Sequence, residues 1–139
     1  MSRVEERAPA TFTNTVALNG ATTIAAGLIL GTQTVAAAGS DQDGAGAITA
    51  TGGAVVIATG ADNTKGVRLP ALSEVKTGQV YLILNNLSNK TLEVFPGTGD
   101  AINPASDNAG ITIAADTIFL CIAMDSAEWF AAELPVAAA

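Results

Sequence analysis

The sequence predicts a single all-β domain, a β-sandwich or barrel-like fold of short antiparallel strands with an extended N-terminal arm. Short apolar and β-branched runs recur between clusters of Gly, Asn, Asp and Pro, a spacing typical of sandwiches and barrels. The length of 139 residues suits one domain. Residues 78–96, GQVYLILNNLSNKTLEVFP, combine an apolar run, a polar turn and an alternating run, which predicts a β-hairpin.

The N-terminal segment, residues 1–15, mixes charges, a proline and small polar residues without periodicity. This composition predicts an extended arm or a disordered terminus. Phe12 is its one aromatic residue; it could anchor the arm on a neighbouring molecule, and a frayed terminus is an equally good interpretation. Residues 16–31 remain open between helix and strand, because their glycines weaken a helix and their threonines favour a strand.

The next part of the chain, residues 32–70, is rich in Gly, Ala and Thr. Its strand-like runs lie at 32–39, 47–52, 54–60 and 66–70, separated by turn residues. The runs do not repeat a common sequence, which favours a sandwich or barrel over a solenoid. The β-rich domain is therefore expected to span residues 16–135, with a loose tail at 136–139.

The C-terminal half supplies the stronger strand signals. Residues 80–84 and 117–124 are continuous apolar runs, which fit strands covered on both faces. Residues 91–95 alternate, and a last strand follows Trp129. The long loop at 97–110 has one large apolar residue to hold it. The predicted core consists of Val80, Leu82, Leu84, Leu92, Val94, Ile102, Ile113, Leu120, Ile122 and Trp129.

The apolar fraction of 49% overstates the expected core. Alanine makes up about a fifth of the chain, and it buries little area, whereas hydrophobic stabilisation scales with area. Aromatic residues amount to only 4%. A lone protomer is therefore expected to have a thin core, and association with copies of itself would supply the missing burial.

The charge distribution is uneven. The formal net charge is −7, and no basic residue follows Lys90. An acidic segment repels phosphate backbones, so nucleic acid is not an expected partner. No stretch has the roughly 18 uninterrupted apolar residues of a membrane span, and Glu5 and Glu6 do not suit the basic start of a signal peptide. The chain is therefore expected to be made in the cytoplasm, with no membrane partner.

The residues that usually carry catalysis are scarce. There is no histidine, and the single cysteine, Cys121, lies in an apolar run where a buried side chain is expected. The SDQDG segment starting at Ser40 resembles the beginning of a calcium loop, but the later ligands are missing. Scattered carboxylates give no identifiable acid–base pair. The sequence therefore predicts no enzyme activity, no metal or cofactor site and no small-molecule substrate.

A succession of motifs from residue 66 onward resembles small structural proteins of tailed bacteriophages, in particular capsid decoration (cement) proteins. The motifs are GVRLP at 66–70, GQVYLILNN at 78–86, LEVFPGTGDAIN at 92–103, AGITIAADTIFLCIA at 109–123 and DSAEWF at 125–130. Their order and spacing carry the resemblance, which covers residues 66–134.

The resemblance implies a β-rich subunit without enzymatic activity on the outer surface of a phage capsid in the virion, commonly as a homotrimer. Its partners would be the major capsid protein and copies of itself. The N-terminal arm would grip the shell or a neighbouring subunit. The residues expected to make that contact are Arg3, Val4, Arg7, Phe12 and Val16.

Two other interpretations remain open. A tail-fibre or host-recognition module that binds glycans would have a similar β-rich composition, although such tips tend to expose several aromatic residues. An enzyme or a cellular carbohydrate-binding domain is the other class. Trp129 and Tyr81, the single Trp and the single Tyr, leave few aromatic platforms for sugars, and Trp129 with Phe130 is better explained as part of a β core or a subunit contact.

Overall fold

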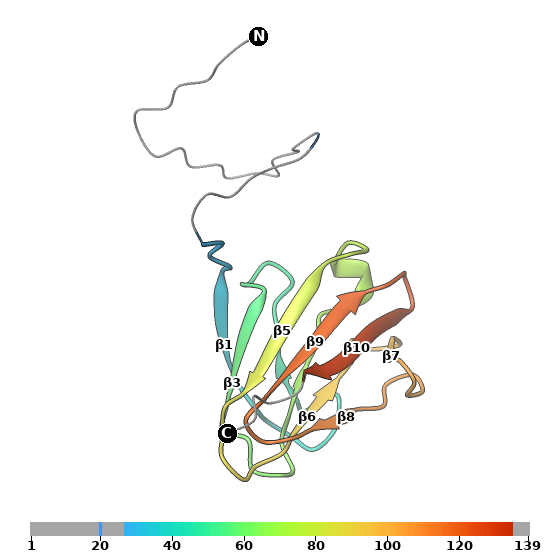
Figure 1. The fold of residues 1–139 in the computed structure, drawn as a ribbon. Coiled ribbons are helices and arrows are strands. Elements are labelled where there is room, and N and C mark those ends of the chain that lie inside the picture. Colours follow the sequence, from blue (N-terminus) through green and yellow to red (C-terminus); the bar gives the residue numbers. More distant parts are fainter. Residues whose placement is uncertain (1–19, 21–26, 135–139) are drawn as a thin grey trace.

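The computed structural model describes residue 20 and residues 27–134, and this part of the chain is all-β (Figure 1). Within it lie ten strands and one short 3₁₀ turn, η1 (Leu72–Glu74). The strands are β1 (Thr32–Ala36), β2 (Gly46–Ala47), β3 (Val55–Thr59), β4 (Gly66–Arg68), β5 (Val80–Asn85), β6 (Leu92–Phe95), β7 (Ala101–Ile102), β8 (Ile111–Ile113), β9 (Thr117–Ala123) and β10 (Glu128–Leu134).

The strands form two sheets whose inner faces share one core. The larger sheet has six strands in the order β1-β3-β5-β9-β10-β7, and the smaller has four in the order β2-β4-β6-β8. Along the chain, strands from β1 to β6 alternate between the larger and the smaller sheet. Several strands are followed by polar corners that place Asn or Asp at positive φ, as at Asn63 and Asn89.

The first three coils stack in parallel, which makes the fold a β-solenoid. β1, β3 and β5 pair in parallel in the larger sheet, and β2, β4 and β6 do so in the smaller. Thr32, Val55 and Leu82 stand in one register row, and each coil takes about 25 residues, within the usual range for solenoids. The prediction of all-β structure is confirmed, whereas the antiparallel sandwich or barrel is wrong.

The reason for this error is physical. A coil needs apolar residues only at its inward positions, so stacked coils need not share a recognisable sequence. Strand lengths and turn residues are also alike in parallel coils and antiparallel hairpins. The absence of a sequence repeat therefore did not exclude a solenoid.

A fourth layer closes the C-terminal end of the stack, and its strands run antiparallel to those of the third coil. β8 pairs with β6 and β9 pairs with β5, both antiparallel. β10 then pairs antiparallel with β9 and carries the short β7 on its far side. The last layers thus cover the edges of β5 and β6 that a simple solenoid would leave open.

The predicted hairpin at 78–96 is wrong, because its two strands lie in different sheets. β5 lies between β3 and β9, whereas β6 lies between β4 and β8. The polar residues between them form a corner, not a hairpin turn. Asn85 stabilises this corner by donating from Nδ2 to the carbonyl oxygens of Lys90 at 2.8 Å and Ala114 at 2.9 Å.

Five of the ten side chains predicted for the core are fully buried. They are Leu92, Val94, Ile102, Ile113 and Trp129, each 0% exposed. The other five, Val80, Leu82, Leu84, Leu120 and Ile122, are only partly buried, and they alternate with the side chains that do face the core.

The inward side chains of β5 and β9 are instead Tyr81, Ile83, Asn85, Phe119 and Cys121. Both runs are apolar on both faces, so alternation could not show which face is buried. The prediction that each strand is covered on both faces is also wrong, since within residues 27–134 no second layer packs on the outward face of the larger sheet. The burial of Cys121 is as predicted.

A tight backbone approach at Gly53 fixes the spacing of the first two coils. A Cβ atom at Gly53 would lie 2.1 Å from the carbonyl carbon of Gly31 and 2.1 Å from the nitrogen of Thr32. Both are backbone atoms, so relief requires β1 to move away from β3. Glycine is required here because it lets two backbones come together.

We predict that Gly53→Ala lowers the free energy of unfolding by about 2 kcal/mol or more, because the added methyl group overpacks a backbone contact. Chemical denaturation measures the change. Gly27→Ala is the matched control, since a Cβ atom at Gly27 has no neighbour within 4 Å. Equal stability of the two variants would contradict the described contact between the coils.

Candidate functional site

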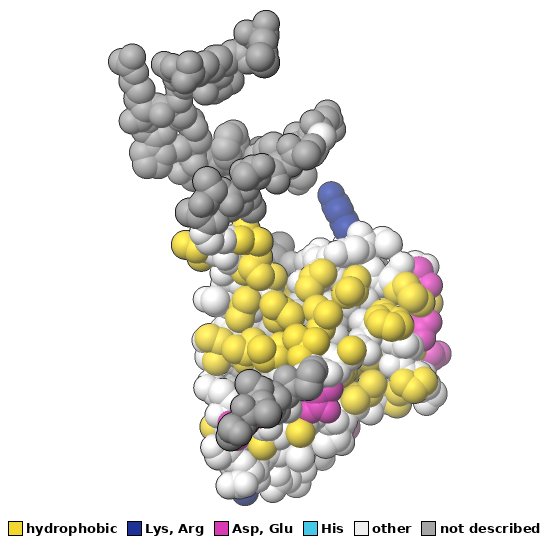
Figure 2. Space-filling view, viewed as in Figure 1, with side chains coloured by type: hydrophobic (Ala, Val, Ile, Leu, Met, Phe, Trp, Pro, Cys, Tyr) yellow, Lys and Arg dark blue, Asp and Glu magenta, His cyan; other side chains and the backbone are white. Residues whose placement is uncertain are grey.

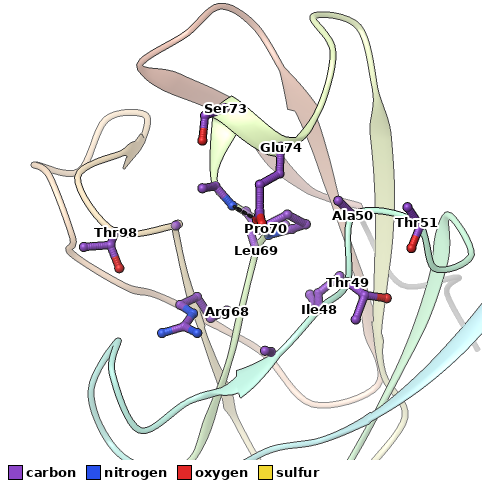
Figure 3. Close-up of a pocket in the computed structure, with 13 residues that line it drawn as sticks. Ile48, Thr49, Ala50, Thr51, Arg68, Leu69, Pro70, Ser73, Glu74 and Thr98 are labelled. Atoms are coloured by element: carbon purple, nitrogen blue, oxygen red, sulfur yellow. Dashed lines mark hydrogen bonds between the residues drawn. The ribbon is translucent and has the colours of Figure 1, made fainter.

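A groove of about 660 Å³ lies in the described part of the chain (Figure 3). One wall is the segment 47–51 at and after β2. The other comprises residues 68–71, Ser73 and Glu74, together with Gly97 and Thr98. The labelled side chains reach the groove from separate coils, with Arg68 beside Thr98 and Glu74 beside Pro70 (Figure 3).

The groove carries one cation and one carboxylate, both with protein partners. Nη1 of Arg68 donates to the carbonyl oxygen of Gln42 at 3.2 Å. Oε2 of Glu74 accepts from the backbone N–H of Ala71 at 3.2 Å. The remaining polar side chains of the lining are hydroxyls of Thr and Ser. This set can hydrogen-bond a polar ligand, but it holds neither a pair of carboxylates nor a nucleophile with a base.

Two residues that the sequence singled out for chemistry, Cys121 and Asp41, have structural roles. Burial raises the pKa of Cys121 far above its usual range, which makes its thiol inert. Oδ1 of Asp41 accepts from the N–H of Gly44 at 2.8 Å and closes the SDQDG turn. Residues 27–134 bring together no group of three His, Cys, Asp or Glu side chains suited to a metal ion. The same residues include no helix of the length and apolarity needed to cross a membrane.

Asp100 connects the loop after β6 to η1. Its Oδ2 atom accepts from the backbone N–H of Leu72 at 2.8 Å, and the side chain is only 8% exposed. Desolvation raises the pKa of Asp100 above its usual value of 3.8. The hydrogen bond from Leu72 partly offsets this, and the charge of Asp107 adds to the rise. The segment FPGTGDAIN thus contains a structural joint.

Asn108 completes this joint from the far end of the loop. Its backbone N–H donates to the carbonyl oxygen of Asp100 at 2.9 Å. Its Oδ1 atom accepts from the N–H of Gly99 at 2.7 Å and from Nε2 of Gln42 at 3.0 Å. Ile102, buried in the core, holds the loop as predicted.

We predict that Asp100→Ala destabilises the fold by about 1–3 kcal/mol, because the N–H of Leu72 loses its buried acceptor. Asp100→Asn retains an acceptor and is the matched variant. Because the folded pKa of Asp100 lies above 3.8, its contribution to stability falls as pH rises from below 3.8 through the folded pKa. The stability of Asp100→Asn relative to wild type should therefore increase as pH rises through this range.

Unfolding free energies of the three proteins from pH 3 to 7 check this prediction. A constant difference between wild type and Asp100→Asn across the range would contradict the raised pKa.

A second candidate site is the outer face of the larger sheet, defined by the side chains of β3, β5, β9 and β10 that point away from the core. Its members are Val55, Ile57, Val80, Leu82, Leu84, Ile118, Leu120, Ile122, Phe130, Ala132 and Leu134. All are partly or fully exposed, and hydrophobic side chains spread across this side of the molecule (Figure 2). The sequence did not reveal this outer face, because five of its members, Val80, Leu82, Leu84, Leu120 and Ile122, were predicted to lie in the core.

The aromatic side chains leave little for stacking on sugars. Trp129 and Tyr81 are 0% and 1% exposed and pack edge to face inside the core, with ring centroids 5.8 Å apart. Phe95 and Phe119 are also buried. Phe130, 49% exposed, is the exposed aromatic residue of the described part, and it belongs to the outer face.

The residues predicted to contact a shell or neighbouring subunit cannot be placed. Arg3, Val4, Arg7, Phe12 and Val16 all lie outside the described residues. The same holds for the predicted arm at 1–15 and the tail at 136–139.

Comparison with protein-family models, with curated proteins and with solved structures gives no match for this chain. Proposals about its function therefore depend on the surfaces described above and on the motifs in its sequence.

Proposed function

We propose that this chain is a non-enzymatic virion structural protein that binds the outside of a bacteriophage capsid and stabilises it, acting as a homotrimer. The single observation that supports this most is the outer face. An exposed apolar sheet face of this extent is typical of a protein that works by association with other proteins. The groove, by contrast, lacks the paired groups that catalysis needs.

The motifs shared with phage decoration proteins support the proposal in a different way. In this structure FPGTGDAIN makes a joint between coils through Asp100, and Trp129 fills the core. Both are scaffold features. The resemblance therefore concerns the scaffold, and the contacts with partners would be made by surfaces and by the arm.

In the proposed arrangement, the N-terminal arm grips the major capsid protein or a neighbouring subunit through Arg3, Val4, Arg7, Phe12 and Val16. A protein that binds only the assembled shell stabilises it by its binding free energy, through mass action. The protein acts in the virion after synthesis in the host cytoplasm. It needs no cofactor, nucleic acid or membrane for this role.

A glycan-binding module of a tail fibre is the second candidate, and the groove beside Arg68 favours it. Its hydroxyl groups and guanidinium could hydrogen-bond an acidic sugar. The burial of Trp129 and Tyr81 weighs against this candidate, because sugars usually stack on exposed aromatic rings.

We predict that the purified protein binds capsids that lack it and raises the temperature at which they lose their contents. Deleting residues 2–15 should abolish binding, whereas deleting 136–139 is the control that should leave it unchanged. Sedimentation of capsids with bound protein measures the binding of the two deletion variants.

Location in the particle separates the two candidates. A copy number on heads comparable with that of the shell protein supports decoration. A few copies on tails, together with binding of purified protein to a glycan array, would contradict decoration and support the fibre module.

A further inference from the structure

We propose that the outer face of the larger sheet is the contact between copies of this chain. The inference rests on the proposed function in one respect, namely that the protein acts by associating with other molecules. It names the surface through which copies of the chain associate. Its starting point is the register of the sheet. Val55, Leu82 and Leu120 form one row across three strands, and Ile57, Leu84 and Ile118 form the next.

The size of the outer face suits a protein–protein contact. Its four strands have five to seven residues each, which corresponds to roughly 400 Å² in projection at about 4.8 Å between strands and about 3.3 Å per residue. An apolar patch of this size is comparable with the largest patch on a typical protein surface, which often serves in binding. Faces of this kind on neighbouring copies can pack together as sheets do in sandwiches, about 10 Å apart.

Exposed apolar residues next to β1 extend the contact area at the edge of the same sheet. Leu28 is 68% exposed, Ile29 is 93% exposed and Leu30 is 39% exposed. Nothing in the described chain covers them. They bring the available apolar area toward the roughly 800 Å² per subunit of a standard interface.

The lack of charge at the centre of the outer face favours a second copy of this chain as its binding partner. The centre of the outer face contains no charged side chain. Glu128 lies at its margin, at the start of β10, and Asp116 lies just before β9. Two copies can therefore meet over this face without opposing like charges at its centre. A basic or acidic partner would find no counter-charge there. An apolar centre with a polar rim is the usual anatomy of a subunit interface.

Like-charged copies held by apolar contacts have a characteristic response to salt. Each chain carries a formal net charge of −7, so repulsion opposes association at low ionic strength and is screened as salt is added. Association through the outer face should therefore strengthen from 20 mM to 500 mM NaCl. A contact based on ion pairs would weaken over the same range.

Sedimentation velocity of the full chain at micromolar concentration tests the inference. Wild type should sediment as a multiple of 13.8 kDa. Leu82→Glu places a charge at the centre of the outer face and should raise the dissociation constant at least about tenfold. Phe130→Glu, at a position already half exposed, is a second variant that should fold and also weaken association. Thr98→Glu adds the same charge in the groove and should leave association unchanged.

Circular dichroism of each variant establishes that it is folded. A monomeric wild type at all concentrations, or folded outer-face variants that associate as wild type does, would overturn the inference. Self-association that appears only after deletion of residues 2–26 would also overturn it, because the chain's own N-terminal segment would then cover the face.

Capsid binding by the same proteins separates this inference from the proposed function. A monomeric wild type that binds capsids, with binding lost in Leu82→Glu, would overturn the self-contact and support decoration. A wild type that self-associates through the outer face but does not bind capsids would support the self-contact and contradict decoration.

Discussion

The position of β5 between two different kinds of neighbour is the constraint on which the rest of the structure depends. On one side it pairs in parallel with β3, continuing the stack of coils, and on the other it pairs antiparallel with β9, which closes the stack. Its inward side chains, Tyr81 and Ile83, are buried in the core, and its outward side chains form the middle of the outer face. One strand thus joins the solenoid to its closing layer and divides core from surface.

Much of the chain could be predicted locally, and its long-range arrangement could not. Turn residues and apolar runs located the strands to within a few residues, and they identified Ile102, Trp129 and Cys121 as buried. The direction of pairing was not predictable, because a strand, a polar corner and a second strand look the same whether the chain folds back or crosses to another sheet. The inward face of β5 and β9 was not predictable either, since both faces of each strand are apolar. A single misassigned face concealed the outer face as a candidate site.

The segment FPGTGDAIN, which carries much of the resemblance to phage proteins, has a structural role here. Asp100 accepts a hydrogen bond from η1, and Asn108 holds the loop around it. Such residues depend on the geometry of the joint, so their pattern can persist while exposed surfaces vary. The coils thus hold the strands of the outer face side by side, and we propose that association with other molecules takes place there.

Nuclear Overhauser effects between backbone protons test the placement of β5 most directly. The account predicts parallel-type contacts between Val56 and the neighbourhood of Leu82 and Ile83, with antiparallel contacts from Leu82 to Leu120. It predicts no cross-strand contacts between β5 and β6, which lie in different sheets. A ladder of antiparallel contacts joining residues 80–85 to residues 92–95 would show a hairpin. That result would contradict the solenoid, the assignment of core and outer face, and the proposals that depend on them.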